Sequence, residues 1–367
     1  MLIAAVLLIL WGISVDAPPF TPIAPQPDYT SLMVAKSDSR DGASRIVTHH
    51  GPWTRIQQTN GPYLTSEYYS AASGARMTVS GQRSITLERK IDSTPGIDLQ
   101  ARKTGERQTY LGESCTVWDV WQTKQPVGAA DISYQSCITD DGITLSEKTL
   151  HGNAVLSSVE ASRLERRPVA PEEVQPPRAL LALDWWDMDL PSFNTPSTPD
   201  HETIMELSGA SSGAAKSIRT TRRLGPWQFR DETIDSRRSI VITHDSLRMQ
   251  FSYASDASGA PKQLSITRPD TISVSFGLKT ASPMTDLHRS ERILGESCRW
   301  FDMMPGVAGA GLRSCLTSDG IALKDIFTGR GMNEQEWTAV RMTRRPIQLD
   351  EIKPPTELLD PKLWGLD

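Results

Sequence analysis

The sequence predicts a mainly β protein of the α+β class, built from two tandem copies of a curved antiparallel sheet with few short helices. Two observations lead to this prediction. The chain of 367 residues repeats itself at an offset of 178, with 17 identities in the 50 positions that align 137–186 with 315–364. Much of each copy also alternates polar and apolar residues with the period of two expected of half-buried strands. A long internal repeat sets the architecture, so the two copies are expected to share one fold.

Composition and repeat together divide the chain into five segments. Residues 1–17 are predicted to be a signal peptide or an N-terminal membrane anchor, because 2–13 form an uncharged apolar run that is shorter than the roughly 20 residues of a lone membrane-spanning helix. The sequence leaves open whether this segment is cleaved. The segments that follow are a proline-rich spacer at 18–28, a first β-rich domain at 29–187, a linker at 188–215, within which 202–207 could be ordered, and a second β-rich domain at 216–367.

Strands are predicted where the alternation is clearest, at 76–79, 84–87, 115–121, 134–139, 239–243, 248–253, 263–267 and 271–276. The shared Asp-Gly pairs at 141–142 and 319–320 predict tight turns. A helix is expected at 28–34 and a single helical turn at 171–174. Each copy then closes with Pro-Pro, Leu-Leu and a tryptophan, Trp186 or Trp364, and we expect this tail to be a short helix or turn whose indole docks on the sheet.

The four cysteines occupy matching places in the two copies. Cys115 and Cys137 belong to the first copy, and Cys298 and Cys315 to the second. One pair per copy behind an apolar N-terminus predicts one disulfide per domain, joining neighbouring strands and contributing about 3 kcal/mol each. The alternative is four buried free thiols in a cytosolic protein.

No set of residues predicts catalysis, a metal or a cofactor. Ser114 and Ser297 lie in GESC, which lacks the final glycine of a nucleophile motif, and the histidines lack ligand spacing. Glu113 and Glu296 are expected to form ion pairs with a shared arginine. The net charge of -5 and pI near 5.8 argue against a nucleic-acid partner.

A shared group of arginines is the one candidate contact surface. Its members precede or belong to the Arg-Arg-Pro of each copy: Arg163, Arg166, Arg167, Arg341, Arg344 and Arg345. They could form a basic stripe for an anionic head group or a protein partner. The alternative, which the sequence favours, is an edge strand that charge protects from aggregation.

The downstream half of each copy, with G-E-x-C, a strand, C-x-T-x-D-G-I-x-L and then R-R-P and Pro-Pro, resembles the LolA/RseB-like superfamily of periplasmic proteins. The resemblance covers about 75 residues per copy. It implies an open half-barrel with helices across its concave side, and an apolar concavity for acyl chains, a lipoprotein's lipid or a related sensor role. No individual ligand residue carries over.

These observations predict a non-enzymatic periplasmic protein, soluble or tethered to the inner membrane by its N-terminal segment. Its expected role is to bind an apolar ligand, a lipid or a lipidated protein. The alternative is an accessory subunit of a membrane-bound envelope complex that acts through protein contacts. The oligomeric state stays open.

Overall fold

The computed structural model describes most of the chain beyond the first 25 residues. The described residues are 26–36, 43–61, 63–81, 84–89, 97–98, 102–123, 132–182, 198–208, 217–244, 249–267, 284–305, 311–329 and 334–366. The predicted N-terminal segment at 1–17 and most of the spacer lie outside them. Among the described residues, no helix has the length and apolar character needed to cross a membrane.

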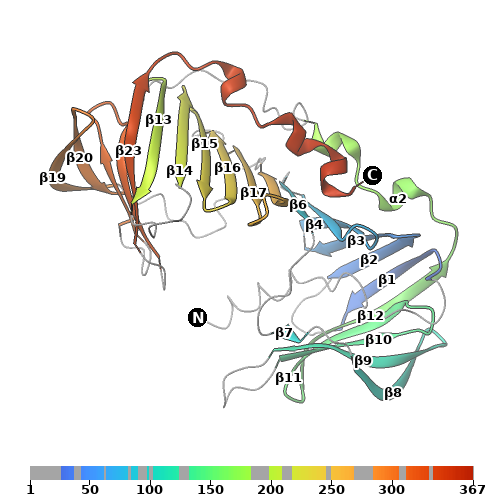
Figure 1. The fold of residues 1–367 in the computed structure, drawn as a ribbon. Coiled ribbons are helices and arrows are strands. Elements are labelled where there is room, and N and C mark those ends of the chain that lie inside the picture. Colours follow the sequence, from blue (N-terminus) through green and yellow to red (C-terminus); the bar gives the residue numbers. More distant parts are fainter. Residues whose placement is uncertain are drawn as a thin grey trace. The chain divides into compact units, whose positions relative to one another are not determined.

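The fold is mainly β, as predicted, and the chain divides into two compact units (Figure 1). The first unit comprises Met1–Gly81 and Lys90–Pro177. The second comprises Gln82–Arg89 and Arg178–Gly365. One strand encoded in the first half of the sequence therefore belongs to the second unit.

In the first unit, neighbouring strands pair antiparallel in the order β8-β9-β10-β11-β12-β1-β2-β3-β4-β5, and the short β7 also pairs with β9. The first strand, β1, thus lies between the last strand, β12, and β2. The sheet stays open among the described residues. Its strands are β1 (Tyr29–Ala35), β2 (Ser44–His50), β3 (Trp53–Asn60), β4 (Tyr63–Ser70), β5 (Ala75–Ser80), β7 (Ile97–Asp98), β8 (Arg102–Tyr110), β9 (Glu113–Thr123), β10 (Ile132–Ile138), β11 (Thr144–His151) and β12 (Ala154–Arg166).

In the second unit the antiparallel order is β19-β20-β21-β22-β23-β13-β14-β15-β16-β17-β18-β6. Here β13, which lies within the predicted linker, pairs with β23 on one side and with β14 on the other. The strands are β6 (Ser84–Arg89), β13 (His201–Ser208), β14 (Ile218–Leu224), β15 (Trp227–Ile234), β16 (Arg237–His244), β17 (Met249–Ser255), β18 (Pro261–Thr267), β19 (Thr285–Ile293), β20 (Glu296–Asp302), β21 (Gly311–Leu316), β22 (Ala322–Thr328) and β23 (Gln335–Arg344).

Both predicted disulfides are present. Cys115 on β9 bonds Cys137 on β10, and Cys298 on β20 bonds Cys315 on β21, with a Cα–Cα distance of 5.3 Å in each. All four sulfurs lie in buried clusters. The first is formed with Ile143, Leu145, Tyr29 and neighbours, and the second with Ile321, Leu323, Trp300 and Trp337. Each disulfide therefore joins adjacent strands at the centre of a core.

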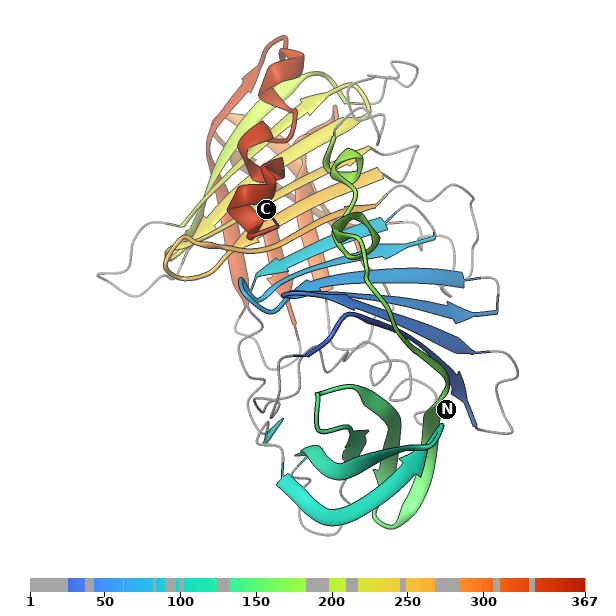
Figure 2. The ribbon, with the colours of Figure 1, turned by 90° about the vertical axis from the view of Figure 1, so that its right-hand side faces the viewer.

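The tail of the second unit docks on its sheet, as predicted. After Pro354-Pro355 it forms the 3-10 turns η4 (Thr356–Leu359) and η5 (Pro361–Trp364), which follow η3 (Leu349–Glu351). Trp364 is fully buried and meets the ring of Tyr253 edge to face, with the centroids 6.5 Å apart. Figure 2 shows the red tail lying across one face of the yellow and orange strands. The corresponding Trp186 lies outside the described residues.

Helices are few and short. Among the described residues, and besides the 3-10 turns of the tail, they are α2 (Pro171–Val174), which confirms the predicted single turn, and η1 (Arg178–Leu181). The helix expected at 28–34 is wrong, because this segment is strand β1. Its alternate residues Tyr29, Ser31 and Met33 are buried between β12 and β2, so pairing on both sides decides its conformation.

Two further expectations differ from the structure. The arginine-bearing strands are not edge strands: β12 pairs with β11 and β1, and β23 pairs with β22 and β13. The predicted linker contains β13, whose Thr203 and Met205 are buried. The strands predicted at 76–79, 84–87, 115–121, 134–139, 239–243, 248–253 and 263–267 are confirmed, whereas 271–276 lies outside the described residues.

Candidate functional site

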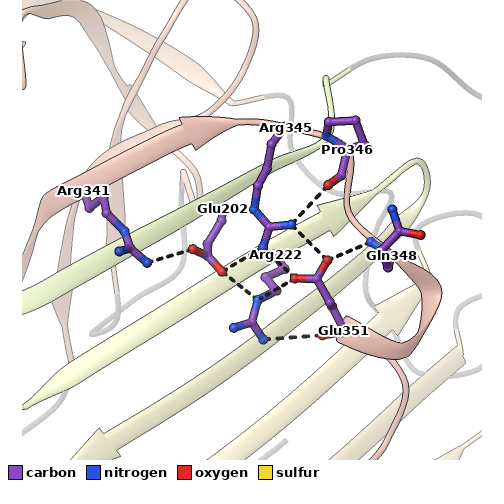
Figure 3. A network of polar contacts seen from close by, with 7 residues as sticks. All are labelled: Glu202, Arg222, Arg341, Arg345, Pro346, Gln348 and Glu351. Atoms are coloured by element: carbon purple, nitrogen blue, oxygen red, sulfur yellow. Dashed lines mark hydrogen bonds and ion pairs between the residues drawn. The ribbon is translucent and has the colours of Figure 1, made fainter.

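A dense polar network centres on Glu202, near the start of β13 in the second unit (Figure 3). Three guanidinium groups donate to its carboxylate. Arg222 on β14 donates over 2.8 Å, Arg341 on β23 over 3.0 Å and Arg345 over 3.2 Å. Antiparallel pairing produces this convergence, because Glu202 lies opposite Arg222 on one side and two positions from Arg341 and Arg345 on the other. Only 10% of the Glu202 side chain is exposed.

Glu351 in η3 completes the network. Its carboxylate accepts two hydrogen bonds from Arg345, at 2.6 and 2.9 Å, and one from the backbone N–H of Gln348 at 2.8 Å. The hydrogen bonds from Arg345 and then from Gln348 lower the pKa of Glu351 to about 2. Burial would raise the pKa of Glu202, but the hydrogen bonds and charges of Arg222, Arg345 and Arg341 together outweigh it and lower that pKa. Three guanidinium groups thus face two carboxylates, which leaves one positive charge in the network.

The first unit repeats only part of this arrangement. Arg167 bonds Glu173 at 2.6 Å, and Glu173 accepts from the N–H of Ala170 at 3.0 Å. Thr30 and Thr48 hold the register positions that Glu202 and Arg222 hold in the second unit. Arg163 bonds Glu165 on its own strand instead. The carboxylate that gathers arginines is therefore specific to the second unit.

A second arginine cluster occurs in both units. Arg166 contacts both Glu113, at 2.7 Å, and Asp141, at 3.0 Å. In the second unit Arg344 contacts Asp319 at 2.7 Å and Glu296 at 3.1 Å. The expected ion pairs of Glu113 and Glu296 with a shared arginine are confirmed. Each arginine connects the end of the last strand to two hairpin turns.

The shared C-x-T-x-D-G-I motif explains the aspartates. The Thr139 hydroxyl donates to Asp141 and accepts from the N–H of Ile143 at 2.8 Å. Thr317 makes the same two bonds with Asp319 and Ile321. The hydrogen bond from Arg344 lowers the pKa of Asp319 to about 2. The most similar residues of the two copies therefore hold turns together.

All six arginines singled out from the sequence contact carboxylates: Arg163, Arg166, Arg167, Arg341, Arg344 and Arg345. The structure brings Arg341 and Arg345 together, and places Arg344 with a different set of acidic groups. Sequence reasoning missed Glu202 and Arg222. Glu351 carried a signal, since it is identical to Glu173 in the repeat, whereas Glu202 lay in the predicted linker.

The remaining candidates have ordinary surroundings. The Ser114 hydroxyl contacts Arg107 Nε at 3.2 Å. Burial lowers the pKa of His49 and of His201, and their Nδ1 atoms lie 3.2 and 2.8 Å from the carbonyls of Pro27 and Pro199. Within the described ranges, no three His, Cys, Asp or Glu residues are grouped so that they could hold a metal ion.

Comparisons with known proteins add a distant likeness. No family model and no curated protein matches this chain. Two solved structures of PNGF-II, in space groups P21 and C2, match at 10% identity with TM-scores of 0.31 and 0.30. The matches cover 67% and 66% of this chain, and the chain spans just under two thirds, 65% and 64%, of PNGF-II. At these TM-scores the likeness carries no argument.

Proposed function

We propose that this is a non-enzymatic, exported envelope protein that acts as an accessory subunit through contacts with a partner protein. The observation that carries the proposal is that the apolar face of the second unit is already covered by its own tail. On β16–β18 and β6, side chains such as Ile240, Phe251 and Leu264 are at most 1% exposed, and the tail that crosses this face places Trp364 against Tyr253 (Figure 2). A face filled in this way favours docking over the carriage of an apolar ligand.

The cysteines support the proposed compartment. Two formed disulfides, each in a buried cluster, are typical of proteins that fold in an oxidising environment such as the periplasm. With an N-terminal apolar segment at 2–13, this supports export, followed by release or by tethering to the inner membrane.

We further propose that the two units are copies of one duplicated fold. Three observations support this. Strand order is alike, with the first strand inserted beside the last in each unit. The disulfides join corresponding strands. The Thr–Asp turn with its bridging arginine occurs in both. The LolA/RseB-like resemblance is a proposal of the same kind.

Exposed apolar side chains mark the surface we propose for docking. In the first unit Tyr63 and Leu64 follow the β3–β4 turn, and Val155 and Leu156 follow the β11–β12 turn, with 44 to 56% of each residue exposed. Because β3 and β11 run in the same direction, both turns lie at the same end of the sheet. Exposed apolar groups at one end of the sheet fit a protein partner.

The test is purification from membranes in a mild detergent, with mass spectrometry of proteins and lipids. Stoichiometric protein partners without lipid are expected. A Leu64→Ser/Leu156→Ser variant should recover less partner, whereas Leu111→Ser, at the opposite end of the same sheet and 50% exposed, should not. Bound lipid without protein partners would instead support the rival proposal, a carrier of a lipid or lipidated protein.

A further inference from the structure

Among the described residues, β6 is the one strand of the second unit that the first half of the sequence supplies. It pairs antiparallel with β18, from Ser84 opposite Thr267 to Glu88 opposite Gln263. Ile85 and Leu87 are fully buried. Arg89 also donates to the carbonyl of Leu363 in the tail, at 3.3 Å. The strand is therefore an integral part of the core that the tail covers.

The pairing places like side chains opposite each other. Its centre is Thr86 opposite Ser265, flanked by Ile85 opposite Ile266 and by Leu87 opposite Leu264. At these three central positions both strands alternate apolar, hydroxyl and apolar side chains, so each apolar side chain lies opposite another apolar one. The edge of β18 thus selects a strand with this alternation.

We infer that β6 is exchangeable, so that β6 of one chain can complete the second unit of another copy and produce a strand-swapped dimer. The swapped ladder contains the same contacts as the internal one, including the 3.2 Å contact between the Ser84 and Thr267 hydroxyls. Exchange of an identical element between protomers is a low-cost route to dimers.

Chain connectivity gives the internal contact only a modest advantage. Ser84 and Thr267 are 183 positions apart, so the contact closes a very long loop. The entropy of closing a loop rises with its length, and a nearby second chain competes better as the loop grows. The swapped dimer is therefore expected when chains fold at high concentration, and dilution of the folded monomer should not produce it.

Two single variants test the exchange. Ser84→Cys chains are mixed with Thr267→Cys chains, unfolded with the native disulfides intact at mildly acidic pH, where thiol exchange is slow, refolded together and then oxidised. Only exchange places the two new thiols opposite each other. Peptide mapping should find a cross-chain link between positions 84 and 267, with a yield that rises roughly in proportion to chain concentration, and light scattering should find a dimer.

Two controls make the result decisive. The double variant Ser84→Cys/Thr267→Cys should form the same link within one chain. Ser258→Cys chains, altered in the exposed β17–β18 turn, should link poorly to Ser84→Cys chains. The proposal is overturned if the double variant links but the mixed single variants do not, or if the Ser258→Cys mixture links equally well. A double variant that fails to link would refute the register itself.

Discussion

Replacing Trp364 with alanine tests whether the tail is part of the core of the second unit. The residue is fully buried and lies edge to face with Tyr253. A buried tryptophan removes about 200 Å² from water, which at about 25 cal/mol per Å² corresponds to about 5 kcal/mol. Truncation of a buried tryptophan to alanine typically costs about 3–5 kcal/mol. We therefore expect Trp364→Ala to lower the free energy of unfolding by about 4 kcal/mol.

The phenylalanine variant separates the ring from its hydrogen bond. Trp364 Nε1 donates to the carbonyl of Leu358 over 2.7 Å, so Trp364→Phe keeps most of the apolar area but leaves that carbonyl unpaired. We expect a loss of about 1–2 kcal/mol. Lys362→Ala, exposed in the same turn, is the control and should change stability by less than about 0.5 kcal/mol.

The assay is denaturant unfolding with hydrogen exchange in β17 and β18, because these strands report on the second unit. Limited proteolysis of the tail provides an independent readout. A loss below about 1 kcal/mol for Trp364→Ala, with the tail still resistant to protease, would refute the reasoning. It would mean that Leu358 and Leu359 hold the tail on the sheet without the indole.

Three other predictions concern the disulfides and pH. Replacing Cys298 and Cys315 with alanine should lower the free energy of unfolding by about 3 kcal/mol, since the bond closes a loop of 17 positions, and an unchanged denaturation midpoint would contradict this. Burial lowers the pKa of His49 and of His201. The stability that these two residues contribute is therefore complete above the unfolded pKa of about 6.5, and it is lost as the pH falls through their lower folded pKa values. A variant with both histidines replaced by glutamine should show a flatter pH dependence of the free energy of unfolding. The hydrogen bond from Arg344 lowers the pKa of Asp319 to about 2. The stability that Asp319 contributes is therefore present above about pH 4 and is lost toward pH 2. Carboxyl NMR titration of the wild type, and unfolding of Asp319→Asn between these pH values, would check this.

Local chemistry made part of the fold predictable. The cysteine pairs could be placed on neighbouring strands because they occupy matching places in the two copies, and the alternation at 84–87 and 263–267 predicted β6 and β18. The Asp-Gly turns followed from residue preferences at tight turns. These signals depend on a few adjacent residues, so tertiary context does not change them.

The missing parts depend on contacts that are distant in sequence. Nothing in the residues of β6 indicates that its partner lies beyond position 260. The segment 28–34 is predicted to be a helix, although Tyr29 and Met33 are buried by two flanking strands. Glu202 gathers arginines from β14, β23 and the segment after it, which only the sheet brings together. Such sites have no local sequence signature.

The origin of β6 also imposes an order on biosynthesis. A ribosome makes Ile85 and Leu87 long before Leu264 and Ile266, the residues that bury them. During synthesis the strand therefore has no permanent partner, and its apolar side chains are available to other strands or to chaperones. The second unit can be completed only after Trp364 has emerged, since this residue closes the same core. Folding of this unit is a late event, and truncated chains should be recognised by quality control as unfinished.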